Sequence, residues 1–200
     1  AVIITMKSTL VGKHKLTGVF FPLPEYYITF THGPPSDKSI LDVDKNVVNA
    51  GDQVKAFITP YDIYGNRIDA HEFETNNPFT VNYRPEAENS DINIPKFEIE
   101  EMDEGSVISY PVTLTKAGVT KFSGFINESP LNTRDVTVLP GDMDFLKSKV
   151  YRFNPNLKKF EILTNGTVEK NNETDPIYRL FPVDKYGNDL EFIPEEKLKQ

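Results

Sequence analysis

Gln53-Val54-Lys55-Ala56-Phe57-Ile58-Thr59, followed shortly by Asp62-Ile63-Tyr64-Gly65-Asn66, is the stretch that decides the fold. Its first part alternates polar and apolar residues, which is typical of a half-buried β-strand. In the second part, glycine and asparagine tolerate positive φ, and the aspartate can accept hydrogen bonds from nearby backbone N–H groups. The same turn recurs 122 positions later as Asp184-Lys185-Tyr186-Gly187-Asn188. We therefore interpret the recurring residues as structural turns of a repeated unit: Asp62, Gly65, Asn66, Asp184, Gly187 and Asn188.

A second phrase recurs as well. Residues 10–20 are similar to residues 115–125, and Gly12 and Gly118 are 106 positions apart. Two different phrases that recur at about the length of one small domain indicate tandem modules. They divide the chain into the C-terminal part of one module (1–33), a complete module (34–140) and the N-terminal part of a third (141–200). Because half a module leaves strand edges unpaired, we expect these residues to belong to a longer polypeptide.

Period-two alternation predicts strands along most of the chain, and 15 prolines with 11 glycines supply turns rather than long helices. Seven predicted strands lie between residues 36 and 140, as in a two-sheet antiparallel sandwich. We thus expect an all-β protein. The predicted strands are 1–6, 15–20, 26–31, 40–43, 53–59, 79–83, 92–99, 107–114, 119–126, 134–139, 149–153, 160–163 and 177–183.

The composition disfavours several classes of partner and site. The net charge of −8 makes nucleic acid an unsuitable partner, because phosphate would be repelled. No apolar run approaches the roughly 20 residues that span a bilayer, so we expect no membrane insertion. Cysteine is absent, which removes disulfides and thiolate chemistry and weakly favours a reducing compartment.

In order and spacing, these motifs resemble the filamin-type immunoglobulin-like repeat. The resemblance covers the whole chain, and the Asp-Gly-Thr-Tyr turn of the family is degenerate here. It implies tandem immunoglobulin-like (filamin-type) β-sandwiches and no chemistry. The matching segments are Ser39-Ile40, Ala50-Gly51-Asp52, Asp62 to Asn66, Asp103-Glu104-Gly105-Ser106, Pro111-Val112-Thr113, Ala117-Gly118-Val119-Thr120-Lys121-Phe122, Glu128-Ser129-Pro130-Leu131, Val138-Leu139-Pro140-Gly141 and Lys147-Ser148-Lys149-Val150.

No catalytic, cofactor-binding or metal-binding residue is predicted. The three histidines lack metal-ligand spacing, and there is no nucleophile elbow, phosphate-binding loop or dinucleotide fingerprint. The acidic run from Glu98 to Glu104 lacks the loop of a calcium site and is better interpreted as a solvated strand face and turn. We therefore expect a protein that is not an enzyme.

The resemblance implies one binding surface. Partner peptides of filamin repeats add as a strand beside the third and fourth strands, and an open edge offers unpaired backbone groups for this. The corresponding residues are Phe79, Val81, Tyr83, Ile92, Ile94, Phe97 and Ile99. The alternative is that the long loop over residues 84–96, with its two prolines, covers or blunts this edge.

The leading interpretation is a structural scaffold whose tandem repeats form a rod or spacer that links cytoskeletal or ciliary components in the cytoplasm. The alternative is an extracellular or cell-surface adhesion stalk built of the same repeats. Its partners would be other proteins: neighbouring repeats and a strand-adding or surface partner. The linkers are short, so we expect small contacts between modules, with Phe145 and Leu146 supplying most of the second one.

Overall fold

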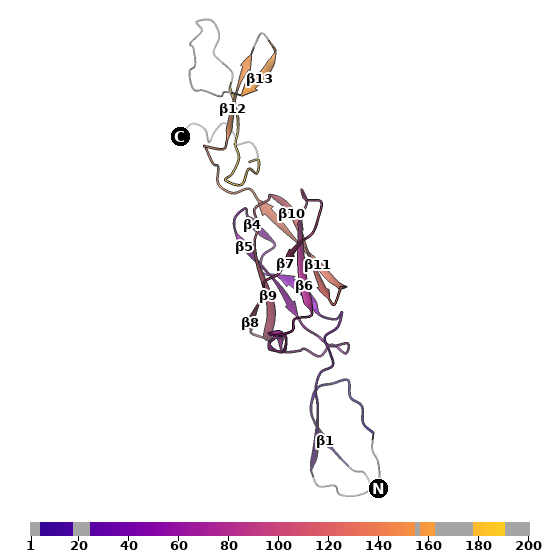
Figure 1. Ribbon diagram of the computed structural model, residues 1–200. Helices are drawn as coiled ribbons and strands as arrows, with labels where there is room; N and C mark the ends of the chain where they lie inside the picture. Colours follow the sequence, from indigo (N-terminus) through magenta and orange to yellow (C-terminus); the bar gives the residue numbers. More distant parts are fainter. Residues whose placement is uncertain (1–4, 18–24, 155–156, 163–177, 191–200) are drawn as a thin grey trace. The chain divides into compact units, whose positions relative to one another are not determined.

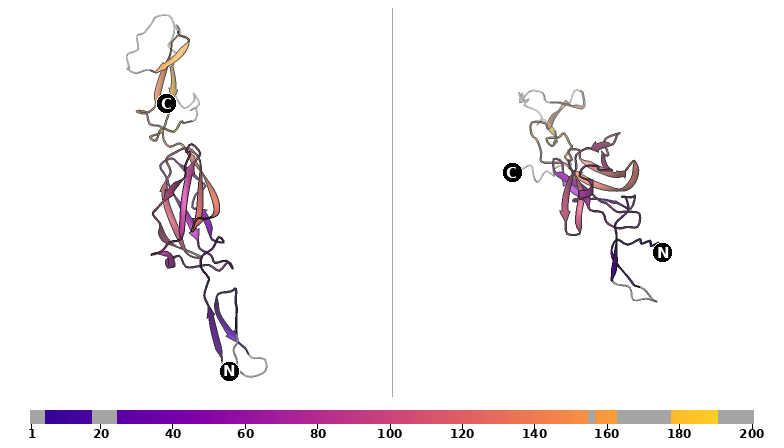
Figure 2. Two further views of the ribbon diagram at one scale, coloured as in Figure 1. Left: turned by 45° about the vertical axis from the view of Figure 1, so that its right-hand side comes forward. Right: turned by 60° about the horizontal axis from the view of Figure 1, so that its bottom comes forward.

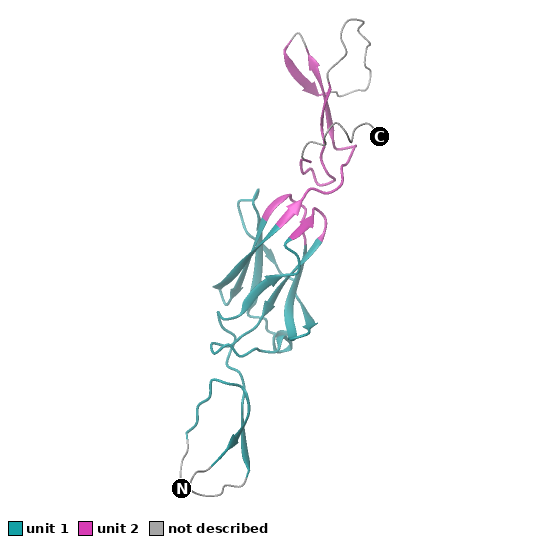
Figure 3. Cartoon of the chain, turned by 180° about the vertical axis from the view of Figure 1, so that it is seen from behind, with its two compact units in different colours: residues 1–46, 53–112, 120–136 teal, residues 47–52, 113–119, 137–200 magenta. Residues whose placement is uncertain are grey.

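The computed structural model describes residues 5–17, 25–154, 157–162 and 178–190. The chain divides into two units (Figure 3). Unit 1 comprises residues 1–46, 53–112 and 120–136, and unit 2 comprises residues 47–52, 113–119 and 137–200. Strands account for nearly all regular structure in the described residues, together with one short 3-10 helix, η1 (Ala70–Phe73) (Figure 1). The all-β prediction is thus confirmed.

Unit 1 contains the body of a β-sandwich, drawn from two sides in Figure 2. One sheet has the order β3-β5-β9-β8, with β3 (Ile40–Val43), β5 (Gln53–Thr59), β9 (Gly105–Thr113) and β8 (Glu98–Met102). The other contains, in order, β11 (Ser129–Leu139), β10 (Gly118–Ile126), β6 (Phe79–Pro85) and β7 (Ile92–Ile94). This two-sheet arrangement is immunoglobulin-like. A separate hairpin pairs β1 (Gly12–Leu16) with β2 (Tyr26–Phe30).

The core follows from the alternation in the sequence. On β5, Val54, Ala56 and Ile58 are fully buried while the residues between them are not. Phe122 on β10 is equally buried, and such side chains from facing strands remove apolar area from water. Tyr110 is buried with its hydroxyl satisfied: it donates to the Phe79 carbonyl (3.0 Å).

Unit 2 contains β4 (Val47–Asn49), which pairs in parallel with the end of β11 from Thr137 to Leu139. It also contains a three-stranded sheet of order β13-β12-β14, formed by β12 (Lys149–Asn154), β13 (Lys159–Ile162) and β14 (Tyr178–Phe181). The loop 113–119 belongs to this unit.

The predicted strands differ from the structure in several places. The strand predicted over 15–20 is observed as β1, which begins earlier, and residues 18–20 lie outside the described residues. The strand predicted over 134–139 is the C-terminal part of the longer strand β11. Residues 92–99 form two strands, β7 and β8, in different sheets, because Pro95 cannot donate to a ladder. The short strand β4 was not predicted, so residues 36–140 contain nine strands rather than seven. Of the predicted strand 1–6, residues 1–4 lie outside the described residues, and Thr5 and Met6 are not in a strand.

Candidate functional site

The turn from Asp62 to Asn66 is held by its own backbone and by the aspartate. The Gly65 N–H donates to the Asp62 carbonyl (3.0 Å), and the Asp62 N–H donates to the Asn66 carbonyl (2.9 Å). Asp62 Oδ1 accepts from the N–H groups of Tyr64 and Asn66, both at 2.9 Å. Gly65 has φ +81°, a conformation that glycine adopts without strain.

The turn from Asp184 to Asn188 repeats this arrangement bond for bond. The Asp184 N–H donates to the Asn188 carbonyl (3.0 Å), and Asp184 Oδ1 accepts from the N–H groups of Tyr186 (2.8 Å) and Asn188 (2.9 Å). Gly187 has φ +86°. The two turns therefore have the same local conformation, as expected for copies of one structural unit.

The second carboxylate oxygen of each aspartate binds a glycine N–H where a linker between modules was expected, at residue 33 or residue 141. Asp62 Oδ2 accepts from the Gly33 N–H (2.9 Å), and Asp184 Oδ2 accepts from the Gly141 N–H (2.9 Å). The same oxygen also accepts from the side-chain amide of the turn asparagine, at 2.8 Å from Asn66 and 2.7 Å from Asn188. Each aspartate thus joins the linker, the turn and the asparagine.

The asparagine then binds the backbone of a segment far earlier in the sequence. Asn188 Nδ2 donates to the Thr115 carbonyl (2.8 Å), and Asn188 Oδ1 accepts from the Ala117 N–H (2.9 Å). In the first turn, Asn66 Nδ2 donates to the Thr9 carbonyl (2.9 Å) and Asn66 Oδ1 accepts from the Val11 N–H (3.4 Å). We call this pair of bonds the asparagine clasp, and we call residues 9–11 and 115–117 the receiving segments.

The clasp accounts for both recurring phrases. Thr115 and Ala117 lie 106 positions after Thr9 and Val11, which is the spacing of the phrase around Gly12 and Gly118. The recurring turn binds the recurring receiving segment, once within unit 1 and once within unit 2. Sequence reasoning identified both phrases as repeats but did not predict that one binds the other.

Burial and hydrogen bonding set the charge state of the turn aspartates. Asp62 and Asp184 are buried, with 1% and 0% of their surface exposed. Burial raises the pKa of Asp62, but hydrogen bonds donated by the Asn66 side chain and the Gly33, Asn66 and Tyr64 N–H groups outweigh it and lower the pKa to about 2. The pKa of Asp184 is lowered by the equivalent donors, again against the effect of burial. Both therefore act as anionic acceptors at neutral pH.

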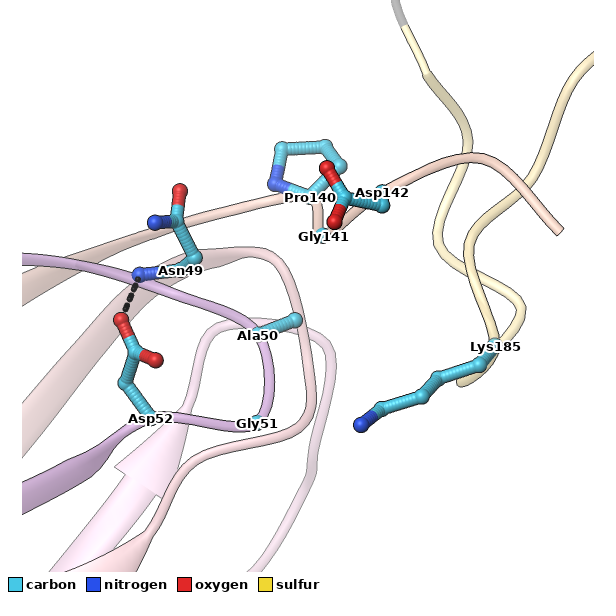
Figure 4. Close-up of a pocket in the computed structure, with 8 residues that line it drawn as sticks. All are labelled: Asn49, Ala50, Gly51, Asp52, Pro140, Gly141, Asp142 and Lys185. Carbon is cyan, nitrogen blue, oxygen red and sulfur yellow. Dashed lines mark hydrogen bonds between the residues drawn. The ribbon is translucent and has the colours of Figure 1, made fainter.

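The second clasp has an additional contact beside it. Gly51, with φ +101°, lies so close to Tyr186 that a Cβ on this glycine would come within 2.6 Å of the tyrosine hydroxyl. Gly51, Gly141 and Lys185 are among the residues that line a small surface pocket of about 350 Å³, and the Lys185 side chain extends toward Gly51 (Figure 4). This pocket is lined by backbone and mixed polar groups, without a nucleophile–base pair.

Phe145 and Leu146 do not supply the second contact. They are 78% and 98% exposed, so this expectation was wrong. The reason is a local turn around Asp144, whose side chain accepts from the Leu146 N–H (2.9 Å) and whose carbonyl accepts from the Ser148 N–H (2.9 Å). This turn leaves the side chains of Phe145 and Leu146 exposed. Hydrogen bonds from Asp184 and Asn188, and packing by Tyr186, make the contact instead.

The residues expected at a strand-adding edge are not all available. Phe79, Val81 and Tyr83 lie on β6, which pairs with β10 on one side and β7 on the other and has no free edge. Phe79, Val81 and Ile94 are buried in the core. Ile92 on β7 is 40% exposed, while Phe97 and Ile99 are half-buried. The outer strands of the two sheets at this side are β7 and β8, so a strand-adding partner there stays a prediction, restricted to those strands.

Metal sites and membrane-spanning helices are the subject of two further findings. No cluster of three or more histidine, aspartate or glutamate side chains suited to a metal ion occurs among the described residues. Nor does that part of the chain contain a helix with the length and hydropathy needed to cross a membrane.

Comparison with protein-family models and with curated proteins found no match. Among solved structures, the chain is similar to the Escherichia coli adhesin FdeC (19% identity, TM-score 0.48, 82% of this chain and 46% of that one). It is also similar to Yersinia pseudotuberculosis InvD (18%, TM-score 0.46, 83% and 47%) and to the Lin-41 filamin domain (10%, TM-score 0.38, 55% and 100%). The chain spans about half the length of the first two.

Proposed function

We propose that the chain is a stretch of tandem immunoglobulin-like modules whose role is structural, and that the asparagine clasp holds each module to the one before it. The modules are residues 1–33, 34–140 and 141–200, as the recurring phrases divide them. The proposal assigns no catalysis to the chain. The observation that carries it is the repetition of one atomic arrangement at two linkers, with the same aspartate, glycine and asparagine in each.

The physical reason for a structural role is that each clasp restrains a short linker. A linker alone leaves neighbouring modules free to reorient, which is the ordinary state of domains with small interfaces. Hydrogen bonds from one module's turn to both the linker and the preceding module remove part of that freedom. A restrained linker maintains spacing, so the tandem array serves as a spacer that links other components.

In the cell, we propose that this spacer belongs to a cytoskeletal or ciliary assembly. A cell-surface adhesion stalk would use the same modules and junctions. Glycosylation distinguishes the cytoplasmic spacer from the cell-surface stalk, because Asn165-Gly166-Thr167 and Asn172-Glu173-Thr174 match the pattern of glycan acceptors. They lie outside the described residues, so only mass spectrometry of the native protein decides. A glycan on either asparagine would overturn the cytoplasmic assignment and favour the stalk.

Small-angle X-ray scattering tests the spacer itself. We compare the 200-residue chain with the double variant Asn66→Ala and Asn188→Ala, and use Asp37→Ala as a control on an exposed linker residue. If the clasps restrain the linkers, the double variant samples a broader distribution of interatomic distances and the control does not. Identical distributions for all three proteins would refute the proposed role of the clasps.

A strand-adding protein partner would bind at β7 in this proposal. It is the outermost strand of its sheet, and its backbone outside the β6 ladder is offered to a partner. Asn93→Pro would remove a backbone N–H donor from this strand and should weaken any such complex. Asn93→Ser keeps the backbone N–H and should not weaken it.

A further inference from the structure

The two junctions differ in how the tyrosine of the recurring turn is placed. Tyr186 in the second turn is half-buried and lies against Gly51. Tyr64, at the same position of the first turn, is 64% exposed, and the preceding Ile63 is 63% exposed. Because the two turns have the same hydrogen bonds, the difference lies in what surrounds the ring and not in the turn.

The contact of Tyr186 depends on a glycine-centred turn that Leu114, the residue after β9, holds in place. The Gly51 N–H donates to the Leu114 carbonyl (2.7 Å), and the Leu114 N–H donates to the Asp52 carbonyl (3.2 Å). Leu114 directly precedes the receiving segment that binds Asn188. The segment from Leu114 to Ala117, between β9 and β10, therefore binds Asn188 through its own backbone groups and also holds the glycine turn that meets Tyr186.

The first junction has the position that corresponds to Leu114. It is Ser8, 106 positions earlier and directly before Thr9. The Ser8 hydroxyl donates to the Leu10 carbonyl (2.9 Å) and accepts from the Leu10 N–H (3.1 Å). Within the described part of the chain, the backbone N–H and carbonyl of Ser8 have no hydrogen-bond partner. The equivalent backbone groups of Leu114 hold the glycine turn at the second junction.

We propose that Tyr64 and the Ser8 backbone, the counterparts of Tyr186 and the Leu114 backbone, form a docking surface for the glycine-centred turn of a neighbouring immunoglobulin-like module, the one whose last strands are residues 1–33. This inference rests on the proposed tandem array. The occupant has defined chemistry: a tight turn of the Ala50-Gly51-Asp52 kind, with glycine at the position that faces the ring. Any side chain there would collide with the tyrosine, as the 2.6 Å approach at Gly51 shows.

The test supplies the missing turn from the chain's own sequence. In an extended protein, a copy of residues 34–141 replaces residues 1–33, so that Gly141 of the first copy takes the place of Gly33. Tyr64→Phe in the first copy leaves one Tyr64 to follow. Nitration with tetranitromethane, read by mass spectrometry, then compares this Tyr64 with Tyr64 of the 200-residue chain. Tyr178, 39% exposed on β14, is the control tyrosine in both proteins.

The expected result is loss of Tyr64 reactivity in the extended protein, down to the level of the half-buried Tyr186, with Tyr178 unchanged. Gly51→Ala in the first copy should restore the reactivity. Because that variant can distort its own turn, Tyr64→Ala in the second copy provides an independent readout: it should shift the first copy's Gly51 Hα resonance, which otherwise lies against an aromatic ring.

Two outcomes would overturn the inference, and they are distinguishable. If Tyr64 stays reactive while Asn66→Ala in the second copy still accelerates exchange of the first copy's Ala117 amide, the clasp forms and the docking surface does not exist. If Tyr64 stays reactive and Asn66→Ala has no effect on Ala117, the clasp itself does not join the modules, and the proposed function fails with it.

Discussion

Replacing Asn188 with alanine removes the side chain that joins the second turn to the receiving segment 115–117. The variant loses the two hydrogen bonds that hold the receiving segment. In the unaltered chain, Asn188 Nδ2 donates to the Thr115 carbonyl (2.8 Å), and Asn188 Oδ1 accepts from the Ala117 N–H (2.9 Å). The bond to Asp184 (2.7 Å) lies within the turn and does not hold that segment. A neutral hydrogen bond contributes about 1 kcal/mol net, so the variant should weaken this contact by about 2 kcal/mol.

Amide hydrogen exchange at Ala117 measures this contact directly, because the Ala117 N–H donates to the oxygen that the variant lacks. Since every 1.4 kcal/mol is tenfold, about 2 kcal/mol corresponds to roughly a 30-fold change in an equilibrium constant. We therefore expect the Ala117 amide of Asn188→Ala to exchange roughly 30 times faster than in the unaltered chain, under conditions where opening precedes exchange.

Asp189→Ala is the matched control, because Asp189 is the next residue, is exposed, and makes no side-chain hydrogen bond or ion pair among the described residues. Its Ala117 amide should exchange at the unaltered rate. Equal exchange rates in Asn188→Ala and Asp189→Ala would show that the asparagine does not hold the receiving segment, and would refute the reasoning.

Three further changes test other parts of the junctions. Ala117→Pro removes the N–H that binds Asn188 and should abolish the second clasp, whereas Ala117→Val keeps the N–H and should preserve it. The chemical shifts of the Asn188 side-chain amide, measured by NMR, distinguish the two results. His32 contacts two acceptors at once, the Gly33 carbonyl and the Glu72 carboxylate, both at 2.8 Å, and their hydrogen bonds raise its pKa. The stabilisation that protonated His32 gives to the first linker should be complete below pH 6.5 and should be lost as the pH rises through the raised pKa. Glu72→Gln should lower the midpoint of the His32 titration measured by NMR. Gly51→Ala should lower the free energy of unfolding by about 1–3 kcal/mol because of its positive φ. Gly33 has no positive φ, and a Cβ added there would make only an ordinary van der Waals contact with Asp62 (3.7 Å), so Gly33→Ala should have little effect on denaturant unfolding.

The alternation of the sequence predicted the strands that line the core and failed where pairing is not local. The bounds of β3 and β5 match the prediction, because Val54, Ala56 and Ile58 give a strict period of two. Strand β4 was missed because three residues carry no period and its parallel partner on β11 lies about ninety positions away. The single predicted strand over 92–99 overlooked that a proline between two apolar pairs can send them to different sheets.

The candidate site was predictable only in part for the same reason. The turn residues and the positive φ of Gly65 and Gly187 follow from the local sequence. The partners of Asn66 and Asn188 lie 57 and 73 positions away, so no local pattern indicates them. The available signal was that two phrases recur together, at spacings of 106 and 122 positions. When two phrases that are distant in sequence recur together in the same order, they are candidates for mutual contact.

The chemistry of the clasp explains which residues must recur and which are free to differ. The aspartate carboxylate orients the asparagine amide, and that amide then binds only a backbone carbonyl and a backbone N–H two residues apart. The side chains of the receiving segment take no part, which accounts for Val11 in one copy and Ala117 in the other. The asparagine cannot change to aspartate, because a carboxylate has no N–H to donate and would face the buried aspartate as a like charge. Residues outside the turn and the receiving segment can therefore differ between the two copies while the contact keeps the same hydrogen bonds.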